Sequence, residues 1–279
     1  MPVAENGNVE IYYEIIGAGE PLVMIEGLGS DHRGLKLRQV PVFRRAGYKC
    51  IILDNRGIGR SSMPDEPYTT LEMASDVACV LSAAGCSPAH VAGWSMGGAI
   101  AQHLAIQHPG CVTTLQLHCT WSRTDRYLAW QLERRRVALA KVGREELIRN
   151  LMLSTFTPNF FQNRHDEVEA TVRAMIGDPS VQPEYSYLRQ LDACKAHDSE
   201  PALSDIKVPT LITVGKEDPL ISVRFAERLN SFLPNATLKV IEQAAHGHSI
   251  EQPEEFNAVC VEFLRSARHR QGTGHQRLQ

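Results

Sequence analysis

The stretch Gly93-Trp94-Ser95-Met96-Gly97 reads G-x-S-x-G and is the most informative part of this chain. The apolar residues 88–94 have strand character, and residues 96–108 repeat with helical periodicity. A serine at such a junction sits on a sharp strand-to-helix turn, where flanking glycines let neighbouring backbone come close. The pattern therefore indicates Ser95 as a candidate nucleophile held at the end of a strand.

Short apolar runs with strand character recur on both sides of this turn, at residues 9–16, 22–26, 49–54, 89–94, 112–118, 210–214 and 238–241. Segments with helical spacing alternate with them, at residues 71–84, 96–108, 223–232 and 253–268. Several of the runs are apolar throughout, which suits strands that are buried on both faces. The alternation predicts an α/β fold with a mainly parallel sheet covered by helices.

The alternation stops between residues 121 and 204, where helical spacing continues without a convincing buried strand. We predict a helical cap there, inserted into an α/β core made of residues 1–120 and 205–268. Caps of this kind cover the carboxyl ends of strands, where open α/β sheets bind their ligands. Residues 269–279 are polar, basic and glycine-containing, and we expect a flexible tail.

Composition narrows the classes of partner. The chain has 279 residues and a net charge of −3, which gives no electrostatic reason to expect nucleic acid or an anionic membrane. The start lacks the pattern of a secretory signal, and no later segment is apolar enough to span a membrane. Seven dispersed cysteines without a CxxC pair predict reduced thiols in a cytoplasmic protein. A small molecule is the expected partner, and assembly into a homo-oligomer stays open.

A serine hydroxyl needs a base to act as a nucleophile, and the base needs an orienting acid. Asp218 follows the run at 210–214, and His246 follows the run at 238–241. Both residues are therefore expected on loops at the sheet edge that carries Ser95. Glu217 is a rival to Asp218 at this point.

Four features together now carry a resemblance: the turn at 93–97, the loop D-N-R-G-I-G-R-S at 54–61, Asp218, and His246 followed by Glu-Gln-Pro at 251–253. In this order, they make residues 21–265 resemble the α/β-hydrolase superfamily, cap insertion included. The loop and the turn are most similar to those of enol-lactonases and polyketide methylesterases. The resemblance implies an α/β-hydrolase fold and no cofactor.

The resemblance also implies roles for individual residues. Ser95 would attack a carbonyl carbon, His246 would accept its proton, and Asp218 would fix the imidazole tautomer. The backbone N–H groups of Met96 and Leu28 would form the oxyanion hole.

One position departs from the family pattern. Glu26 stands where the family usually has histidine, in the loop Glu26-Gly27-Leu28-Gly29. Its carboxylate could hydrogen-bond nearby backbone and only shape the loop. Alternatively, it could serve as an acid or base in a non-hydrolytic reaction, because a charged carboxylate beside an oxyanion hole would oppose negative charge.

Two rival sites are weaker. His246 and His248 form a His-x-His pair, but no nearby Cys/His cluster completes a metal site. The sequence Gly57-Ile58-Gly59 suggests a nucleotide loop, yet Ser62 stands where that motif has Gly or Ala and no helix clearly starts there, so we expect no nucleotide cofactor.

The sequence thus predicts a serine hydrolase that cleaves an ester or lactone through an acyl-enzyme intermediate. Two other classes stay open. One is elimination, cyclisation or acyl transfer with Glu26 participating, and the other is a ligand-binding protein with little turnover. The substrate itself is not predicted.

Overall fold

The computed structural model describes residues 2–178 and 181–275. One eight-stranded sheet runs through the described chain in the order β1-β2-β4-β3-β5-β6-β7-β8. Its strands are β1 (Val3–Asn6), β2 (Val9–Ile16), β3 (Glu20–Ile25), β4 (Tyr48–Leu53), β5 (Ala89–Trp94), β6 (Val112–His118), β7 (Thr210–Gly215) and β8 (Ala236–Ile241). The neighbouring strands β4, β3, β5, β6, β7 and β8 pair in parallel. At one edge of the sheet, β2 pairs antiparallel with β4, and β1 pairs antiparallel with β2. The predicted mainly parallel sheet is confirmed.

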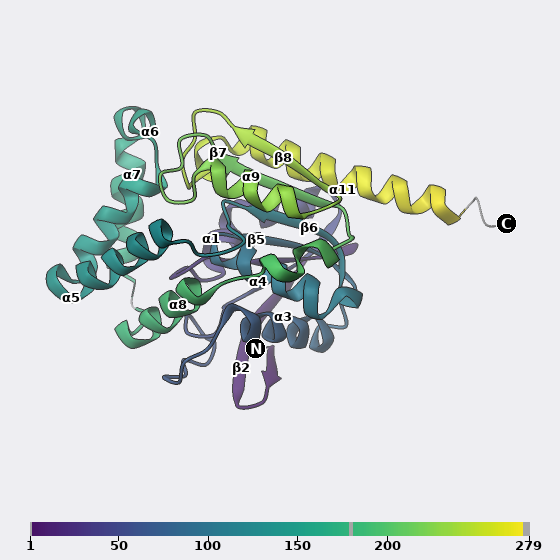
Figure 1. The fold of residues 1–279 in the computed structure, drawn as a ribbon, viewed down its shortest axis with the longest axis horizontal. Helices are drawn as coiled ribbons and strands as arrows, with labels where there is room; N and C mark the ends of the chain where they lie inside the picture. Colours follow the sequence, from purple (N-terminus) through teal and green to yellow (C-terminus); the bar gives the residue numbers. More distant parts are fainter. Residues whose placement is uncertain (1, 179–180, 276–279) are drawn as a thin grey trace.

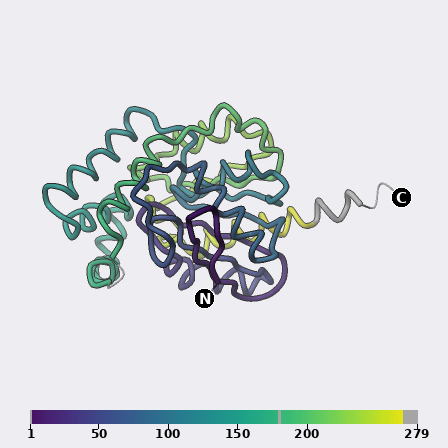
Figure 2. Tube along the Cα trace, turned by 90° about the horizontal axis from the view of Figure 1, so that it is seen from below, coloured from purple at the N-terminus to yellow at the C-terminus, as the bar shows by residue number. Residues whose placement is uncertain are grey.

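Helices cover both faces of the sheet (Figures 1 and 2). Alternate residues of β3 show this, because Val23 and Ile25 pack in one core cluster while Leu22 and Met24 pack in another. The first cluster includes residues from α3 (Thr70–Ala83), α4 (Met96–Gln107) and α9 (Val223–Phe232). The second includes residues from α1 (Arg33–Arg38), α2 (Val40–Arg45) and α11 (Pro253–His275). Burial on both faces explains why β3 is apolar without interruption from Leu22 to Ile25.

Four α-helices of the described chain lie between β6 and β7, where the sequence predicted a cap. They are α5 (Arg126–Thr155), α6 (Pro158–Asn163), α7 (His165–Ile176) and α8 (Glu184–Ala196), and they gather at one end of the molecule in Figures 1 and 2. Gly143 has a φ of 84° inside α5 and marks a kink between two helical segments. A small apolar cluster from α5, α6 and α7, including Met152 and Phe160, gives this insertion packing of its own.

The C-terminal helix differs from the expectation. We expected residues 269–279 to form a flexible tail, but α11 continues to His275. Residues 276–279 of that expectation lie outside the described residues. Among the helices of the described chain, none combines the length and the apolar character that a membrane crossing requires.

Candidate active site

Ser95 lies at the direct junction of β5 and α4. Its φ of 51° and ψ of −116° are strained for a residue with a side chain. The flanking glycines are needed because backbone crowds them. A Cβ on Gly93 would lie 2.2 Å from the carbonyl oxygen of Gly97, and a Cβ on Gly97 would lie 2.0 Å from that of Ile25. The structure therefore has the sharp turn that the G-x-S-x-G pattern predicts.

Asp218 and His246 form a hydrogen-bonded pair. His246 Nδ1 donates to Asp218 Oδ2 at 2.7 Å, and Asp218 Oδ1 accepts the N–H groups of Leu220 and Ile221 at 2.9 Å each. The Asp218 side chain is fully buried, whereas that of His246 is 17% exposed. Since Nδ1 carries the proton for Asp218, neutral His246 keeps a lone pair on Nε2. Glu217 is exposed, so the structure selects Asp218 as the partner of His246.

The three residues lie at one edge of the sheet. Strands β5, β6, β7 and β8 are neighbours and run in parallel, so the segments that follow them emerge together. Ser95 N donates to the carbonyl oxygen of His118 at the end of β6, at 2.9 Å. Within the described residues, no hydrogen bond joins Ser95 Oγ to His246. The structure thus holds an Asp–His pair and a strained serine on the same edge.

The candidate oxyanion donors lie on the two segments that meet at Ser95. Met96 is the first residue of α4, whose N-terminus favours negative charge. Leu28 follows β3, and the preceding Gly27 packs closely on the serine, since a Cβ there would lie 3.2 Å from Ser95 Cβ. Their role in stabilising an oxyanion stays a prediction.

Glu26 hydrogen-bonds backbone beside this loop. Its Oε2 accepts the N–H of Gly27 at 3.3 Å, and its Oε1 lies against Gly34 in α1, where a Cβ would be 3.1 Å away. Burial raises the pKa of Glu26 to about 7, although the Gly27 N–H and the charge of Arg38 oppose the rise. The geometry matches the interpretation in which Glu26 shapes the loop.

Helix α8 of the cap holds the same loop, which the sequence did not reveal. Gln190 is fully buried, and its Oε1 accepts the N–H of Gly29 at 3.1 Å while its Nε2 donates to the carbonyl of Arg56 at 2.9 Å. One turn earlier, Ser186 Oγ donates to the carbonyl of Gly57 at 2.7 Å. These bonds join the cap to the loops after β3 and β4.

Glu251 joins the cap to the segment of His246. It ends α10 (His248–Glu251), and its Oε1 accepts the N–H of Ala245 at 2.7 Å. Its Oε2 accepts the N–H and the hydroxyl of Thr157, at 3.0 and 2.7 Å. Gly247 N also donates to the carbonyl of Thr155 at 2.6 Å. The segment that carries His246 is therefore anchored to the cap, directly through Gly247 and indirectly through Ala245 and Glu251.

The family described as alpha/beta hydrolase fold matches residues 20–253. The chain belongs to the α/β-hydrolase family. A protein named "Putative carbamate hydrolase RutD" from Azorhizobium caulinodans is 33% identical over 264 residues, covering 94% of this chain and 98% of that protein. Two solved structures are similar across nearly their whole length. "Putative non-heme bromoperoxidase BpoC" from Mycobacterium tuberculosis H37Rv has a TM-score of 0.84 and 29% identity, covering 92% of this chain and 96% of that chain. The enol-lactonase from Burkholderia xenovorans LB400 has a TM-score of 0.84 and 25% identity, covering 95% and 100%.

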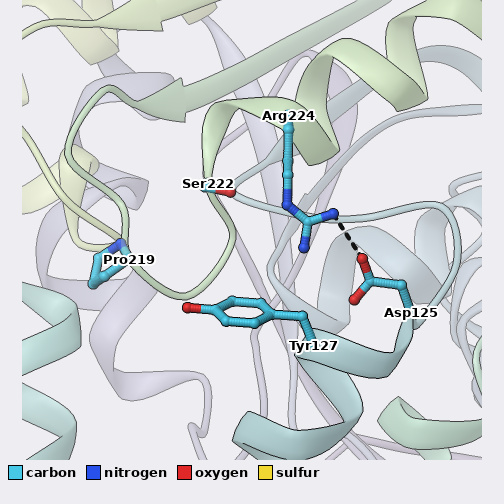
Figure 3. A pocket seen from close by; sticks show the side chains of 5 residues that line it. All are labelled: Asp125, Tyr127, Pro219, Ser222 and Arg224. Carbon is cyan, nitrogen blue, oxygen red and sulfur yellow. Dashed lines mark hydrogen bonds and ion pairs between the residues drawn. The ribbon is translucent and has the colours of Figure 1, made fainter.

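An open hollow of about 600 Å³ lies beside the Asp218 segment of this α/β-hydrolase (Figure 3). Residues from the start of α5 and from the segment between β7 and α9 line it, namely Asp125, Tyr127, Pro219, Ser222 and Arg224. Arg224 Nη1 and Asp125 Oδ2 form an ion pair at 2.6 Å across it. The hollow therefore lies between the start of α5 and the segment from β7 to α9, and this ion pair joins its two sides.

The residues considered for a metal or nucleotide site contact other residues of the protein. Asp31, His32 and Asp54 lie close enough together to approach a cation. However, His32 Nδ1 faces Asp54 at 2.7 Å and its Nε2 faces Glu14 at 3.2 Å. Gly57 of the α/β-hydrolase loop packs on side chains, since a Cβ there would lie 2.4 Å from the Tyr68 hydroxyl. Close packing and the φ of 90° therefore explain why position 57 is a glycine.

Proposed function

We propose that this α/β-hydrolase is a serine hydrolase, which cleaves an ester or lactone of a small organic molecule through an acyl-enzyme intermediate. The observation that carries the proposal is the Asp218–His246 hydrogen bond at the sheet edge that also holds the strained Ser95 turn. A buried carboxylate that fixes the Nδ1–H tautomer leaves Nε2 as the base, which is what a serine nucleophile needs.

The reaction follows from these positions. His246 Nε2 accepts the Ser95 hydroxyl proton as Oγ bonds to the carbonyl carbon of the substrate. Collapse of the tetrahedral intermediate breaks the bond to the leaving oxygen, which takes the proton back from Nε2. Water then attacks the acyl-enzyme, with His246 as base again, and releases the acid and Ser95. Asp218 stabilises the imidazolium formed in both steps.

Negative charge on the intermediate requires fixed donors. We assign the N–H groups of Met96 and Leu28 to this role, because both segments meet at Ser95. Loss of one such donor typically costs on the order of 2.7–4 kcal/mol of transition-state stabilisation. The bond from Gly29 to Gln190 supports the loop that carries Leu28.

Similar proteins guide the choice of substrates. An enol-lactonase and a protein named as a carbamate hydrolase both share this fold over nearly the whole chain. Esters, lactones and carbamates all present a carbonyl carbon with a heteroatom leaving group, which is what the proposed serine would attack. The first compounds to test are therefore acyl compounds with an oxygen leaving group, and carbamates are the second group.

A substrate panel in water enriched in oxygen-18 tests this proposal. We expect hydrolysis of at least one aryl ester, lactone or carbamate, with one heavy oxygen in the acid product and loss of turnover in Ser95→Ala. A product without oxygen from water would instead favour elimination, cyclisation or acyl transfer with Glu26 participating. Ligand binding without turnover would favour the third class, a binding protein.

A cytoplasmic location is part of the same proposal. All seven cysteines are free thiols, and five of them are buried. Reduced, buried thiols are typical of proteins from reducing compartments. Fractionation of the producing cell tests the location, and recovery outside the cytoplasm would contradict it.

A further inference from the structure

The sequence singled out His248 as half of a His-x-His pair, and the structure gives it a different role. The side chain of His248 is fully buried at the start of α10, two residues after His246. Its Nδ1 lies 3.3 Å from the carbonyl oxygen of His246, and its Nε2 lies 2.8 Å from the Thr213 hydroxyl. Both ring nitrogens are therefore engaged within the protein, and His248 is not a metal ligand here.

The contacts continue into the sheet. Thr213 lies in β7, and its hydroxyl also contacts Nδ1 of His118, at 2.8 Å. His118 ends β6 and is fully buried, and its carbonyl oxygen accepts the N–H of Ser95. A chain of hydrogen bonds thus runs from the residue that holds the Ser95 main chain to the carbonyl of His246. This chain of hydrogen bonds connects the main chain of Ser95 with the main chain of His246.

One arrangement of protons satisfies every link. A carbonyl oxygen only accepts, so Nδ1 of His248 must carry its proton, and a neutral His248 then accepts at Nε2. The Thr213 hydroxyl donates to that nitrogen and accepts from Nδ1–H of His118. His118 Nε2 is then a bare lone pair, and this buried atom has no hydrogen-bond partner among the described residues.

The surroundings keep both imidazoles neutral. Phe256 of α11 packs edge-on to His118 and His248, with ring centroids 4.8 and 5.2 Å away, and the Trp94 ring lies 4.5 Å from that of His118. Burial in this apolar layer lowers the pKa of His248 to about 4 and that of His118 well below its ordinary value. The direction of the chain is therefore fixed at neutral pH.

We propose that His248 is a positioning residue for His246, which the Thr213–His118 chain holds in the tautomer that donates to the His246 carbonyl. The proposal rests on the proposed function. The peptide N–H groups on either side of His246 are already bound, by Glu251 and by the Thr155 carbonyl. The bond from His248 fixes the carbonyl group of the same His246–Gly247 peptide, and so sets where the His246 ring meets Asp218 and Ser95.

Two substitutions of His248 and one matched control test the proposal. His248→Leu removes the donor, whereas His248→Asn can place an amide N–H near the position of Nδ1. His90→Leu is the control, because His90 is also buried, in β5, and bonds Thr114 Oγ1 at 2.8 Å and Glu20 Oε2 at 3.2 Å, but at the far end of the sheet from the site. It removes a similar His–Thr bond without touching the segment of His246.

The main readout is the second-order rate of Ser95 labelling by a fluorophosphonate, measured below the unfolding temperature of every variant. We expect His248→Leu to be slower by on the order of 10- to 100-fold, since a small misplacement of a catalytic group costs that much. His248→Asn should recover most of the rate, and His90→Leu should lose stability but keep the native rate. Native-rate labelling of folded His248→Leu, or equal slowing in His90→Leu, would overturn the proposal.

A second readout does not depend on the reaction. The Nδ1 proton of His246 bound to Asp218 gives a low-field NMR signal, which we expect to weaken in His248→Leu and persist in His248→Asn and His90→Leu. If the native protein resists labelling, the proposed function fails, and this signal still decides the positioning role. If His248→Leu does not fold, the comparison of His248→Asn with His248→Gln replaces it. Gln places its amide nearer Nε2, so identical signals in the two would overturn the proposal.

Discussion

Replacement of Glu26 by glutamine separates its structural role from a chemical one. Glu26 accepts the N–H of Gly27 and lies against Gly34, and burial raises its pKa to about 7. A carboxyl group with this environment is easier to bury when neutral. Glutamine has a similar shape, carries no charge at any pH, and keeps one oxygen that can accept the Gly27 N–H.

The expected effect grows with pH. Because the pKa of Glu26 is higher in the folded chain than the ordinary value of 4.5, the unfolded chain loses this proton first as pH rises. The folded wild type therefore loses stability between about pH 4.5 and 7, and Glu26→Gln does not. At 1.36 kcal/mol for each pKa unit, the gain of the variant reaches at most about 3 kcal/mol above pH 7. Glu26 is only partly buried, so solvent reduces this limit.

Urea unfolding of both proteins, at about pH 4.5 and about pH 8, measures this difference. Glu66→Gln, in an exposed loop, controls for the change in net charge. A stability difference that is the same at both pH values would refute the reasoning about Glu26. Turnover should persist in Glu26→Gln, and its loss in a stable variant would favour the non-hydrolytic class.

The remaining predictions concern the turn, the acid and the cap. Gly97→Ala would push a Cβ to 2.0 Å from a main-chain oxygen of β3, so its thermal unfolding midpoint should fall sharply, whereas Gly110→Ala, where a Cβ meets nothing within 4 Å, should unfold like wild type. Asp218→Asn should lower kcat on the order of 10⁴-fold with little loss of stability, and near-native kinetics would contradict its role as the orienting acid. Gln190→Leu should lower kcat about tenfold or more at similar KM, because it releases the loop after β3. Ser186→Ala removes a neighbouring cap bond, and equal losses of kcat in both variants would show general loosening instead.

Local patterns predicted much of the fold. The strand at 112–118 and the helix at 223–232 have the predicted boundaries, because a run of apolar and β-branched residues and a helical face are both recognised from neighbouring residues. Strand β1 was missed. It has four residues and buries mainly Ala4, so its hydrophobic pattern is too short to recognise. Pairing with β2 makes it a strand, and pairing is not written in local sequence.

In the candidate site, too, some residues were predicted from local sequence and others were not. Asp218 and His246 were predicted from their places after strands, and the structure joins them by a hydrogen bond. Gln190 was missed because its bond to Gly29 spans 161 residues, and no spacing rule reaches that far. Glu251 stood in the quoted Glu-Gln-Pro segment, yet its bond to the cap depends on how α6 packs. The sequence therefore predicted the residues that we propose as catalytic, but not the contacts that support them.

Covalent labelling tests the central claim most directly. The claim is that His246 and Asp218 activate Ser95 at the carboxyl edge of the sheet. Intact-mass analysis after treatment with a fluorophosphonate should show one adduct in the native protein, mapped to Ser95 and absent in folded Ser95→Ala. A folded native protein that stays unmodified, or an adduct that persists in Ser95→Ala, would contradict the account.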